Sequence, residues 1–479
     1  MIQGCGSDVG KSVLVAGLCR LFANRGLSVS PFKPQNMSNN AAACAEGGEI
    51  GRAQALQARA CRKPPAVDMN PVLLKPDSDL TAQVILQGRA VGRWRAGVWA
   101  EARRPLLEPV LESFHRLEAA SDLVIVEGAG SPAETNLRDG DIANMGFARA
   151  CQCPVVLVGD IDRGHVIAAL VGAHAVLDPD DRALIQGFIV NKFRGDSSLF
   201  DGGRHEIVRR TGWRDIGLVP WLRAARLLPS EDTVVVEGTA PRGAASSLVV
   251  APLLPRIANA DEFDALGQDP RIDFRFVAPG TPIPAQADLV VLPGTKSTLA
   301  DLAFLRAEGW DIDIQAHVRR GGAVMGVCGG YQMLGRTVAD PHGVEGGGEA
   351  RGLGLLDVET VLSAEKQVRP VAGQLATGER FRGYEIHCGV TTGPGRGRPF
   401  LDREGLGADG AVSADGRIWG AYVHGLFDDG QARAGIMARI GSGSDGVDHE
   451  ARIEAALDEL ARELERCVDI GALSRIAGL

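Results

Sequence analysis

Cys328 is the residue whose neighbours best equip it to act as a nucleophile. It ends an apolar run and is followed by two glycines, in the sequence AVMGVCGGYQMLG at residues 323–335. This pattern predicts a strand, a sharp turn and a helix, because glycines permit the backbone angles that present a thiol at the end of a strand. The amino end of the helix favours a thiolate. We therefore expect Cys328 to attack an acyl carbon; the alternative is a buried cysteine that packs as a small apolar residue.

Two glycines and a histidine are candidate partners of this cysteine. The backbone N–H groups of Gly329 and of Gly294, which lies in the turn after the preceding strand, are candidate donors to the oxyanion that such an attack forms. His424 follows the strand-like run at residues 420–423. A histidine at one strand end is a natural base for a cysteine at a neighbouring strand end, so we predict that His424 activates Cys328. A purely structural histidine is the alternative.

A second kind of chemistry is indicated where the chain begins, in the sequence GCGSDVGKS. Glycines precede Lys11 and Ser12, and apolar residues then recur at helical spacing, which is typical of a phosphate-binding loop that leads into a helix. In such a loop the backbone N–H groups, including those of Gly6 and Gly10, hold phosphate oxygens. Lys11 neutralises the outer phosphates and Ser12 ligates magnesium. Asp8 belongs to the same loop, and its role is open.

Polar residues end two later strand-like runs. Glu127 follows the run at 122–126, and Asn191 follows the run at 185–190. Because an acid at the carboxyl end of a parallel strand faces the ligand crevice, Glu127 is a candidate second magnesium ligand, with a solvated carboxylate as the alternative. The amide of Asn191 is a candidate for reading the adenine edge of a nucleotide. Short apolar strands that alternate with helical stretches predict a parallel α/β sheet.

An amide-rich loop, KPQNMSNN at residues 33–40, follows another strand-like run. Residues of these types either form turns or, beside a nucleotide, hold a polar substrate. The composition favours the two alternatives equally. We take Lys33, Gln35 and Asn36 as candidate substrate-binding residues.

The composition describes a protein with several domains and no basic excess. Its 479 residues suggest about two to four domains, and 45% of them are hydrophobic. A net charge of −9 argues against a general binder of nucleic acids or anionic membranes. The cysteines form no CxxC pair, no signal peptide precedes them, and no apolar run is long enough to cross a membrane. We therefore expect a cytoplasmic protein that binds neither nucleic acid nor membrane.

Changes in pattern along the chain divide it into two parts. Residues 230–247 mix acids, glycine, proline and alanine without a period, and a fresh set of strands begins at 248. We predict two doubly wound α/β domains, 1–229 and 248–479, joined by this linker. Residues 449–468 place apolar side chains on one helical face, which predicts a helix packed on the second domain; a partner-binding helix is the alternative.

These motifs resemble those of known families. Cys328 in GVCGGYQMLG and His424 in YVHGLF resemble a class I glutamine amidotransferase domain, and the loop GCGSDVGKS is similar to that of dethiobiotin synthetase. Over most of the chain the sequence resembles the cobyric acid synthase family. The blocks that carry this resemblance, besides the Cys328 and His424 motifs, are GSDVGKS, KPQNMSNN, VEGAGSPAE, IANMGFA, VGDIDRG, VNKFRGD and GYEIH.

The resemblance implies an enzyme with two active sites. A cysteine thiolate in the second domain would hydrolyse the side-chain amide of glutamine and release ammonia. In the first domain ATP and Mg²⁺ would drive amidation through an acyl phosphate. The implied acceptor is adenosylcobyrinic acid a,c-diamide, amidated at carboxylates b, d, e and g to adenosylcobyric acid in cobalamin biosynthesis. The family implies no tightly bound organic cofactor, and the oligomeric state is unknown.

The acid of the glutaminase site is the point at which the sequence departs from the class. Class I amidotransferases commonly carry His-x-Glu at the end of the triad, whereas residue 426 is a leucine. A Cys–His dyad, as in the cobyric acid synthase branch, is our interpretation. Glu385 and Asp428 are the alternatives for an orienting acid.

Three other functions share parts of this pattern. The related a,c-diamide synthase has both domains, but the KPQNMSNN block favours cobyric acid synthase. An amidotransferase that acts on a cell-wall lipid intermediate divides the two activities between chains. A P-loop partitioning ATPase with a regulatory second domain has no use for the Cys328 turn, so glutaminase activity would distinguish it.

Overall fold

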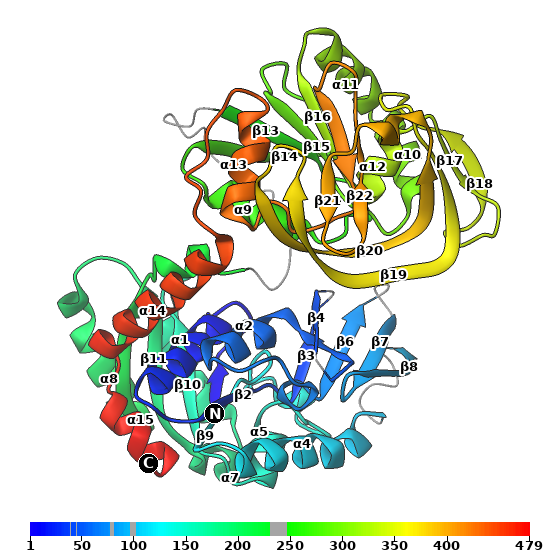
Figure 1. Cartoon of the computed structure of the whole chain (residues 1–479). Coiled ribbons are helices and arrows are strands. Elements are labelled where there is room, and N and C mark those ends of the chain that lie inside the picture. The colour runs from blue at the N-terminus through cyan, green and yellow to red at the C-terminus, as the bar shows by residue number, and fades with distance from the viewer. Residues whose placement is uncertain (39, 45, 77–80, 96–101, 230–246) are drawn as a thin grey trace. The chain divides into compact units, whose positions relative to one another are not determined.

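The computed structural model describes the chain except residues 39, 45, 77–80, 96–101 and 230–246, and it divides into two compact units. Unit 1 comprises Met1–Thr233 and Ile453–Leu479, and unit 2 comprises Val234–Arg452. Residues 230–246 of the predicted linker lie outside the described residues. Its last residue, Ser247, already begins the first strand of unit 2. Each unit is a separate α/β fold (Figure 1).

Unit 1 is built on a parallel sheet. Four strands lie in the order β1-β10-β11-β12, and a bridge between Ile2 and Glu127 continues the sheet to the parallel pair β9 and β2. The strands are β1 (Ile2–Gly4), β2 (Val29–Phe32), β9 (Leu123–Val126), β10 (Val155–Asp160), β11 (Ile185–Phe193) and β12 (Arg214–Pro220). Helices connect them: α1 (Lys11–Asn24), α2 (Arg52–Ala60), α4 (Leu107–Ala119), α5 (Met145–Ala150), α6 (Val166–Val176), α7 (Pro179–Ala183) and α8 (Asp201–Thr211).

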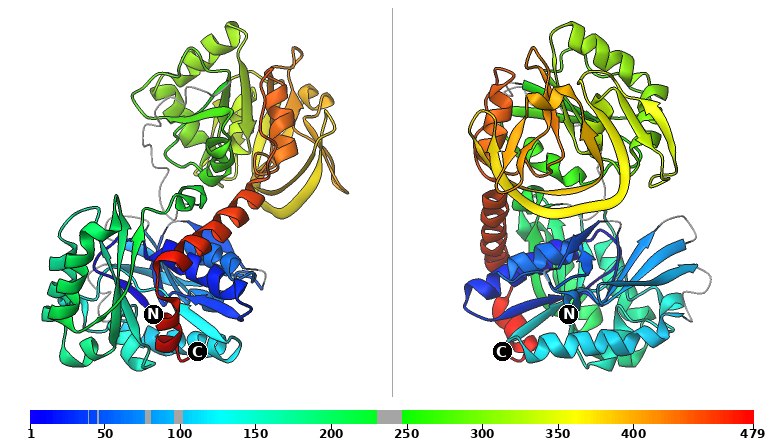
Figure 2. Two further views of the ribbon diagram at one scale, coloured as in Figure 1. Left: turned by 90° about the vertical axis from the view of Figure 1, so that its left-hand side faces the viewer. Right: turned by 45° about the vertical axis from the view of Figure 1, so that its right-hand side comes forward.

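Alternation along the strands explains why helices cover both faces of this sheet. In β10, Val156 and Val158 pack in one core with α1, whereas Val155 and Leu157 pack in another core with α5 and α6. Successive strand residues point to opposite faces, so a strand that is apolar throughout requires two helical layers. Figure 2 shows the layers from two further directions.

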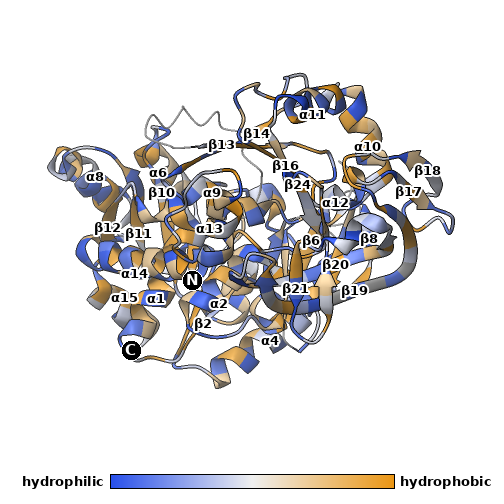
Figure 3. Ribbon diagram, turned by 45° about the horizontal axis from the view of Figure 1, so that its top comes forward, coloured by the Kyte–Doolittle hydropathy of each residue, from blue (hydrophilic) through white to orange (hydrophobic). Residues whose placement is uncertain are grey.

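The final two helices belong to unit 1. The apolar face of α14 (His449–Cys467) and α15 (Ile470–Ala477) shares a core with α1, and α14 carries both hydrophilic and hydrophobic residues (Figure 3). A methyl group added at Gly17 of α1 would lie 2.5 Å from Cδ1 of Leu464 and 2.8 Å from Cγ of Leu460. The helix and its apolar face were predicted correctly, but its placement on the second domain was wrong. Its apolar face packs on α1 of unit 1, where Gly17 allows Leu460 and Leu464 to approach closely.

A smaller, mainly antiparallel sheet completes unit 1, with the strand order β3-β6-β7-β8. Strand β3 lies within the candidate substrate loop, and the other strands, with a separate pair formed by β4 and β5, follow it. Their bounds are β3 (Gln35–Met37), β4 (Ala41–Ala43), β5 (Glu49–Gly51), β6 (Val72–Pro76), β7 (Thr81–Leu86) and β8 (Arg89–Arg95).

Unit 2 contains a second sheet that is covered on both faces. Its order is β14-β13-β15-β16-β24-β23, and every pairing is parallel except that of β23 with β24. The strands are β13 (Ser247–Pro252), β14 (Ile272–Val277), β15 (Leu289–Leu292), β16 (Ala323–Val327), β23 (Ala411–Val412) and β24 (Ile418–Ala421). The helices are α9 (Asp264–Gln268), α10 (Thr298–Ala307), α11 (Trp310–Arg319), α12 (Gly329–Leu334) and α13 (Gly430–Ala438). The prediction of two α/β domains is confirmed.

A curved hairpin of long strands, drawn in yellow in Figure 1, stands beside the parallel sheet of unit 2. It pairs β19 (Glu359–Leu375) with β20 (Arg380–Thr392), and the shorter strands β17 (Thr337–Asp340), β18 (Gly348–Arg351), β21 (Leu401–Arg403) and β22 (Gly407–Asp409) extend it. Among the described helices of either unit, none combines the length and apolarity that a membrane crossing requires.

Candidate active sites

Cys328 occupies a strained turn between β16 and α12. Its backbone angles are φ 50° and ψ −109°, in a region that residues with a side chain rarely adopt. The turn is held by a hydrogen bond from its N–H to the carbonyl of Ala421 on the neighbouring strand (2.9 Å). A methyl group added at Gly330 would lie 2.1 Å from the carbonyl oxygen of Leu292, so only glycine allows this close approach. The structure therefore shows the strand, turn and helix that the glycine pattern predicted.

His424 lies beside this cysteine, at the end of β24. The two strands run parallel, with Val327 opposite Ala421, so their carboxyl ends meet at one edge of the sheet. The imidazole is 1% exposed and stacks on the ring of Tyr384, with 5.3 Å between ring centroids. The Cys328 thiol donates a hydrogen bond to the carbonyl oxygen of Ile386 (3.4 Å), and its proximity to His424 contributes to the raised pKa of the imidazole. Parallel register thus brings together two residues that stand far apart in the sequence.

Glu262 supplies a carboxylate to this histidine that the sequence did not indicate. Both of its oxygens lie 3.3 Å from Nδ1 of His424, and the backbone N–H of Gly425 also donates to it (3.4 Å). Glu262 is 2% exposed, in a short 3₁₀ helix at Ala260–Phe263 after β13. Although burial lowers the pKa of His424, the charges of Glu262 and Cys328 outweigh it and raise that pKa well above its ordinary value.

Neither of the two acids considered from the sequence is a hydrogen-bond partner of His424. Glu385 accepts hydrogen bonds from Arg369 (2.7 Å) and Arg403 (2.5 Å), and although its burial raises its pKa, these arginines lower it overall. Asp428 is half-buried near other acids, and desolvation followed by the charges of these acids raises its pKa well above the ordinary value. Among the acids considered, Glu262 is the one whose carboxylate lies against the imidazole of His424.

The two candidate oxyanion glycines border the same turn. A methyl group added at Gly294 would lie 2.7 Å from Cε1 of His424, and one added at Gly329 would lie 3.2 Å from the backbone nitrogen of Thr295. The segment after β15 therefore lies directly against the amino end of α12. Gly329 is the first residue of that helix, where a backbone N–H has no acceptor within the helix.

The phosphate-binding loop of unit 1 has the expected shape. Gly10 takes the left-handed conformation (φ 91°) at the start of α1. The ammonium of Lys11 donates to the carbonyl oxygens of Gly6 (2.9 Å) and Gly130 (3.1 Å), so it bridges the loop and the segment after β9. Burial, which outweighs the carboxylate of Glu127, lowers the pKa of Lys11.

Glu127 is the centre of a buried polar cluster at the mouth of this loop. Its Oε1 accepts from Ser12 Oγ (2.7 Å) and from Lys33 Nζ (2.8 Å), and its Oε2 accepts from Gln57 Nε2 (2.6 Å). Burial raises the pKa of Glu127, but Lys33 and the hydrogen bonds outweigh this effect and lower it. The solvated alternative for Glu127 is wrong, since the residue is 1% exposed. Gln57, on α2, is a member that the sequence did not indicate.

Asn191 and Lys192, on β11, donate hydrogen bonds to backbone carbonyls of the phosphate-binding loop, including that of Asp8. The amide of Asn191 donates to the carbonyl of Val9 (2.8 Å), and a methyl group at Gly10 would lie 2.4 Å from its Nδ2. Lys192 donates to the carbonyl of Asp8 (2.5 Å) and to Asp160 (2.9 Å). One of the two N–H groups of the Asn191 amide thus braces the loop, and the reading of the adenine edge by this amide stays a prediction.

The amide-rich loop places its three candidates in different surroundings. Lys33 joins the Glu127 cluster, and Asn36 is buried, where it donates to Gln54 of α2 (2.9 Å). Gln35 lines a cavity of about 360 Å³ next to the phosphate-binding loop. Residue 39 of this loop lies outside the described residues.

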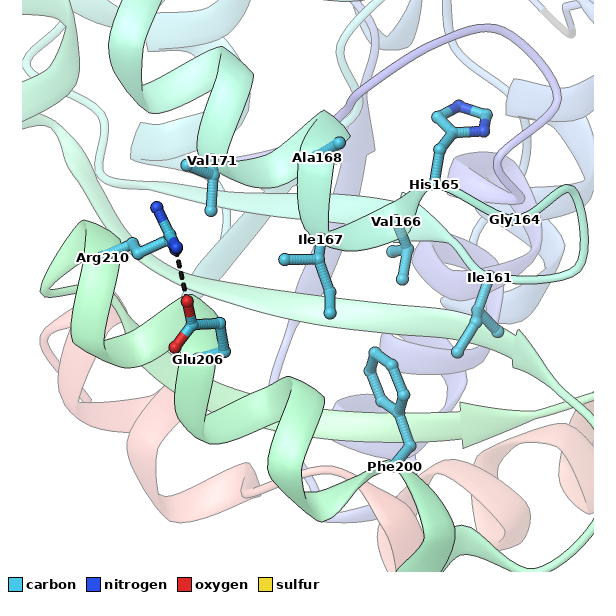
Figure 4. Close-up of a pocket in the computed structure, with 10 residues that line it drawn as sticks. All are labelled: Ile161, Gly164, His165, Val166, Ile167, Ala168, Val171, Phe200, Glu206 and Arg210. Carbon is cyan, nitrogen blue, oxygen red and sulfur yellow. Dashed lines mark hydrogen bonds and ion pairs between the residues drawn. The ribbon is translucent and has the colours of Figure 1, made fainter.

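A second cavity of unit 1, of about 530 Å³, lies between α6 and α8 (Figure 4). Its wall is mostly apolar, and the side chains of Glu206 and Arg210 pair with each other (2.5 Å). His165 at its rim has φ 53°, a left-handed angle that suits glycine better. Glu206 and Arg210 neutralise each other, so we expect this cavity to attract an anion less strongly than the cavity at Gln35 does.

Comparison with known proteins identifies two domains and a family for this chain. Residues 1–235 match the CobQ/CobB/MinD/ParA nucleotide binding domain, and residues 248–432 match the CobB/CobQ-like glutamine amidotransferase domain. The chain is 65% identical to the cobyric acid synthase of Caulobacter sp. (strain K31), over 100% of this chain and 99% of the relative. It is 60% identical to that of Cereibacter sphaeroides (strain ATCC 17023), over 100% and 99%. The chain therefore belongs to the cobyric acid synthase family, as an ATP-dependent ligase that uses glutamine as its amido donor.

Proposed function

We propose that this chain amidates carboxylates b, d, e and g of adenosylcobyrinic acid a,c-diamide, in four cycles, to give adenosylcobyric acid. The observation that carries the proposal is His424 against a buried carboxylate, at the same sheet edge as a cysteine on a strained turn, in a chain that also has a phosphate-binding loop. A glutaminase site and an ATP site are what a glutamine-dependent ligase needs. The names of the relatives support the acceptor.

The glutaminase half-reaction follows from the unit 2 geometry. The Cys328 thiolate attacks the side-chain amide carbon of glutamine, and N–H groups of Gly294 and Gly329 stabilise the oxyanion. The His424 imidazolium gives its proton to the leaving nitrogen, so ammonia departs and a thioester remains. Water then hydrolyses the thioester, with His424 as base, and glutamate is released. Glu262 keeps the proton of Nδ1 in place, which leaves Nε2 for the thiol and the leaving group.

The synthetase half-reaction uses ATP to convert a carboxylate into a better acyl donor. A carboxylate oxygen attacks the γ-phosphorus, ADP leaves, and ammonia displaces phosphate from the acyl phosphate. Lys11 and the loop N–H groups stabilise charge on the transferred phosphoryl group. Gln35 is the member of the amide-rich loop for which the surroundings support a substrate contact.

The residues at the loop fit a magnesium ion that is bound together with nucleotide. Mg²⁺ typically takes one or two protein oxygens besides phosphate and water, and the hydroxyl of Ser12 and the carboxylate of Glu127 lie 2.7 Å apart. When bound, the ion would neutralise phosphate charge.

The test is to count amidations by mass spectrometry with native protein and with Cys328→Ala, supplied with either glutamine or ammonia. Each amidation lowers the mass slightly and removes one negative charge. We expect four amidations by the native protein, none by Cys328→Ala with glutamine, and recovery with ammonia. If the native protein forms no corrinoid amide from either nitrogen source, the proposed acceptor is wrong.

A further inference from the structure

The cavity beside the phosphate-binding loop is bordered by a buried cation. Gly6, Ser7 and Gln35 form one wall, and Arg103 lies among residues of the 129–144 segment that form the rest. The carbonyl oxygens of Gly6 and Gly130, which both accept from the Lys11 ammonium, belong to residues of this lining. The cavity therefore opens next to the group that handles the transferred phosphoryl.

Arg103 has no acidic partner in the described part of the chain. It is 8% exposed, and its Nη2 donates to the carbonyl oxygens of Leu137 (2.6 Å) and Asp139 (2.5 Å). Its Nε is buried without a hydrogen-bond partner. Two carbonyls fix the plane of the guanidinium without neutralising its charge, and a desolvated cation of this kind is stabilised by an anion.

The other charged groups of this cavity are already compensated or face solvent. Arg138 is paired with Asp181 (2.5 Å). Asp141 accepts three backbone N–H groups, at distances of 2.8, 3.0 and 2.9 Å. Glu134 is exposed. The unpaired positive charge in the lining is therefore that of Arg103, and the Gln35 amide, which makes no hydrogen bond among the described residues, adds a neutral donor.

We propose that this cavity binds the carboxylate that is about to be activated, and that Arg103 holds it by a charge-assisted, forked hydrogen bond. The inference rests on the proposed function and adds to it the part of unit 1 that recognises the acid. One oxygen of the bound carboxylate attacks the γ-phosphorus, and the bond from that phosphorus to the bridging oxygen breaks, so that ADP leaves with the electron pair. After amidation the neutral group lacks the charge that Arg103 binds, which favours release of the amide.

The experiment compares the affinity of the full-length protein for acid and for amide. Binding of adenosylcobyrinic acid a,c-diamide and of adenosylcobyric acid is measured by equilibrium dialysis, with the corrin absorbance as the readout. Because a hydrogen bond to a charged group is lost, Arg103→Gln is expected to weaken binding of the acid by about 10- to 100-fold and of the amide by less than about 3-fold. Arg104→Gln is the matched control, because Arg104 is exposed and pairs with an exposed Asp139 (2.5 Å).

Other outcomes overturn the inference. An equal loss of affinity for acid and amide would show that Arg103 only supports the 137–139 segment. A loss confined to ATP binding would assign Arg103 to the nucleotide phosphates. If Arg103→Gln loses the native circular dichroism, Arg103→Lys carries the test: it keeps the charge but not the fork, so acid binding should fall by about 10-fold with amide binding unchanged. Native protein that forms no amide would instead refute the proposed function, and the inference with it.

Discussion

Replacing Glu262 by glutamine tests whether a residue from a distant segment orients the glutaminase histidine. The substitution keeps the size of the side chain and removes its charge. Two unit charges 3.3 Å apart attract each other by about 5 kcal/mol at an effective dielectric constant of about 20. Desolvation offsets part of this energy, and hydrogen bonds to charged groups contribute about 1.5–3 kcal/mol net. We therefore expect kcat/KM for glutamine to fall by about 10- to 100-fold.

The pH dependence gives a second readout. Glu262 raises the pKa of His424, so the imidazolium persists to higher pH. Without the carboxylate this pKa falls, and the alkaline limb of kcat/KM for glutamine should move to lower pH. The same sign holds for stability: the contribution of the ion pair is complete below the ordinary histidine pKa and is lost as the pH rises through the raised pKa.

The assay is glutamine hydrolysis coupled to glutamate detection, with ammonia-dependent amidation measured in parallel. Asp261→Asn is the matched control, because it removes the same charge one residue away. Ammonia-dependent amidation should be unchanged in both variants. If Glu262→Gln keeps kcat/KM within about two-fold of the native value and shows the same alkaline limb, the orienting role is refuted.

Three further substitutions separate the two sites and test the position of the last helices. Lys11→Gln should lower ATP-dependent amidation by about 100-fold or more while glutamine hydrolysis is unchanged; equal losses in both activities would contradict the separation. Gly294→Ala places a methyl group 2.7 Å from Cε1 of His424, so glutaminase activity should be lost and ammonia-dependent amidation kept. Leu460→Ala, at a fully buried position of α14, should lower the free energy of unfolding by about 2–5 kcal/mol in urea, whereas the exposed Glu465→Ala should change it by less than about 0.5 kcal/mol.

The local backbone at the two candidate sites was predictable from the sequence. The turn at Cys328 and the loop at Lys11 are each encoded within a few residues, because glycines set the backbone angles and an apolar period sets the strand or helix on either side. His424 was predictable for a similar reason, since a polar residue at the end of an apolar strand of a parallel sheet faces the same edge as its neighbours.

The partners of these residues were decided by tertiary structure. Glu262 and His424 are separated by 162 positions, and Glu262 lies in a short helix whose sequence carries no triad signature. Arg103 is an ordinary arginine in the sequence, and only the surrounding carbonyls and the cavity show that its charge is buried. The helical period of the sequence predicted the apolar face of α14, but it did not predict that this face packs on α1 at Gly17. Sequence patterns determine local backbone and the faces of elements, whereas the contacts between distant segments depend on how whole elements pack.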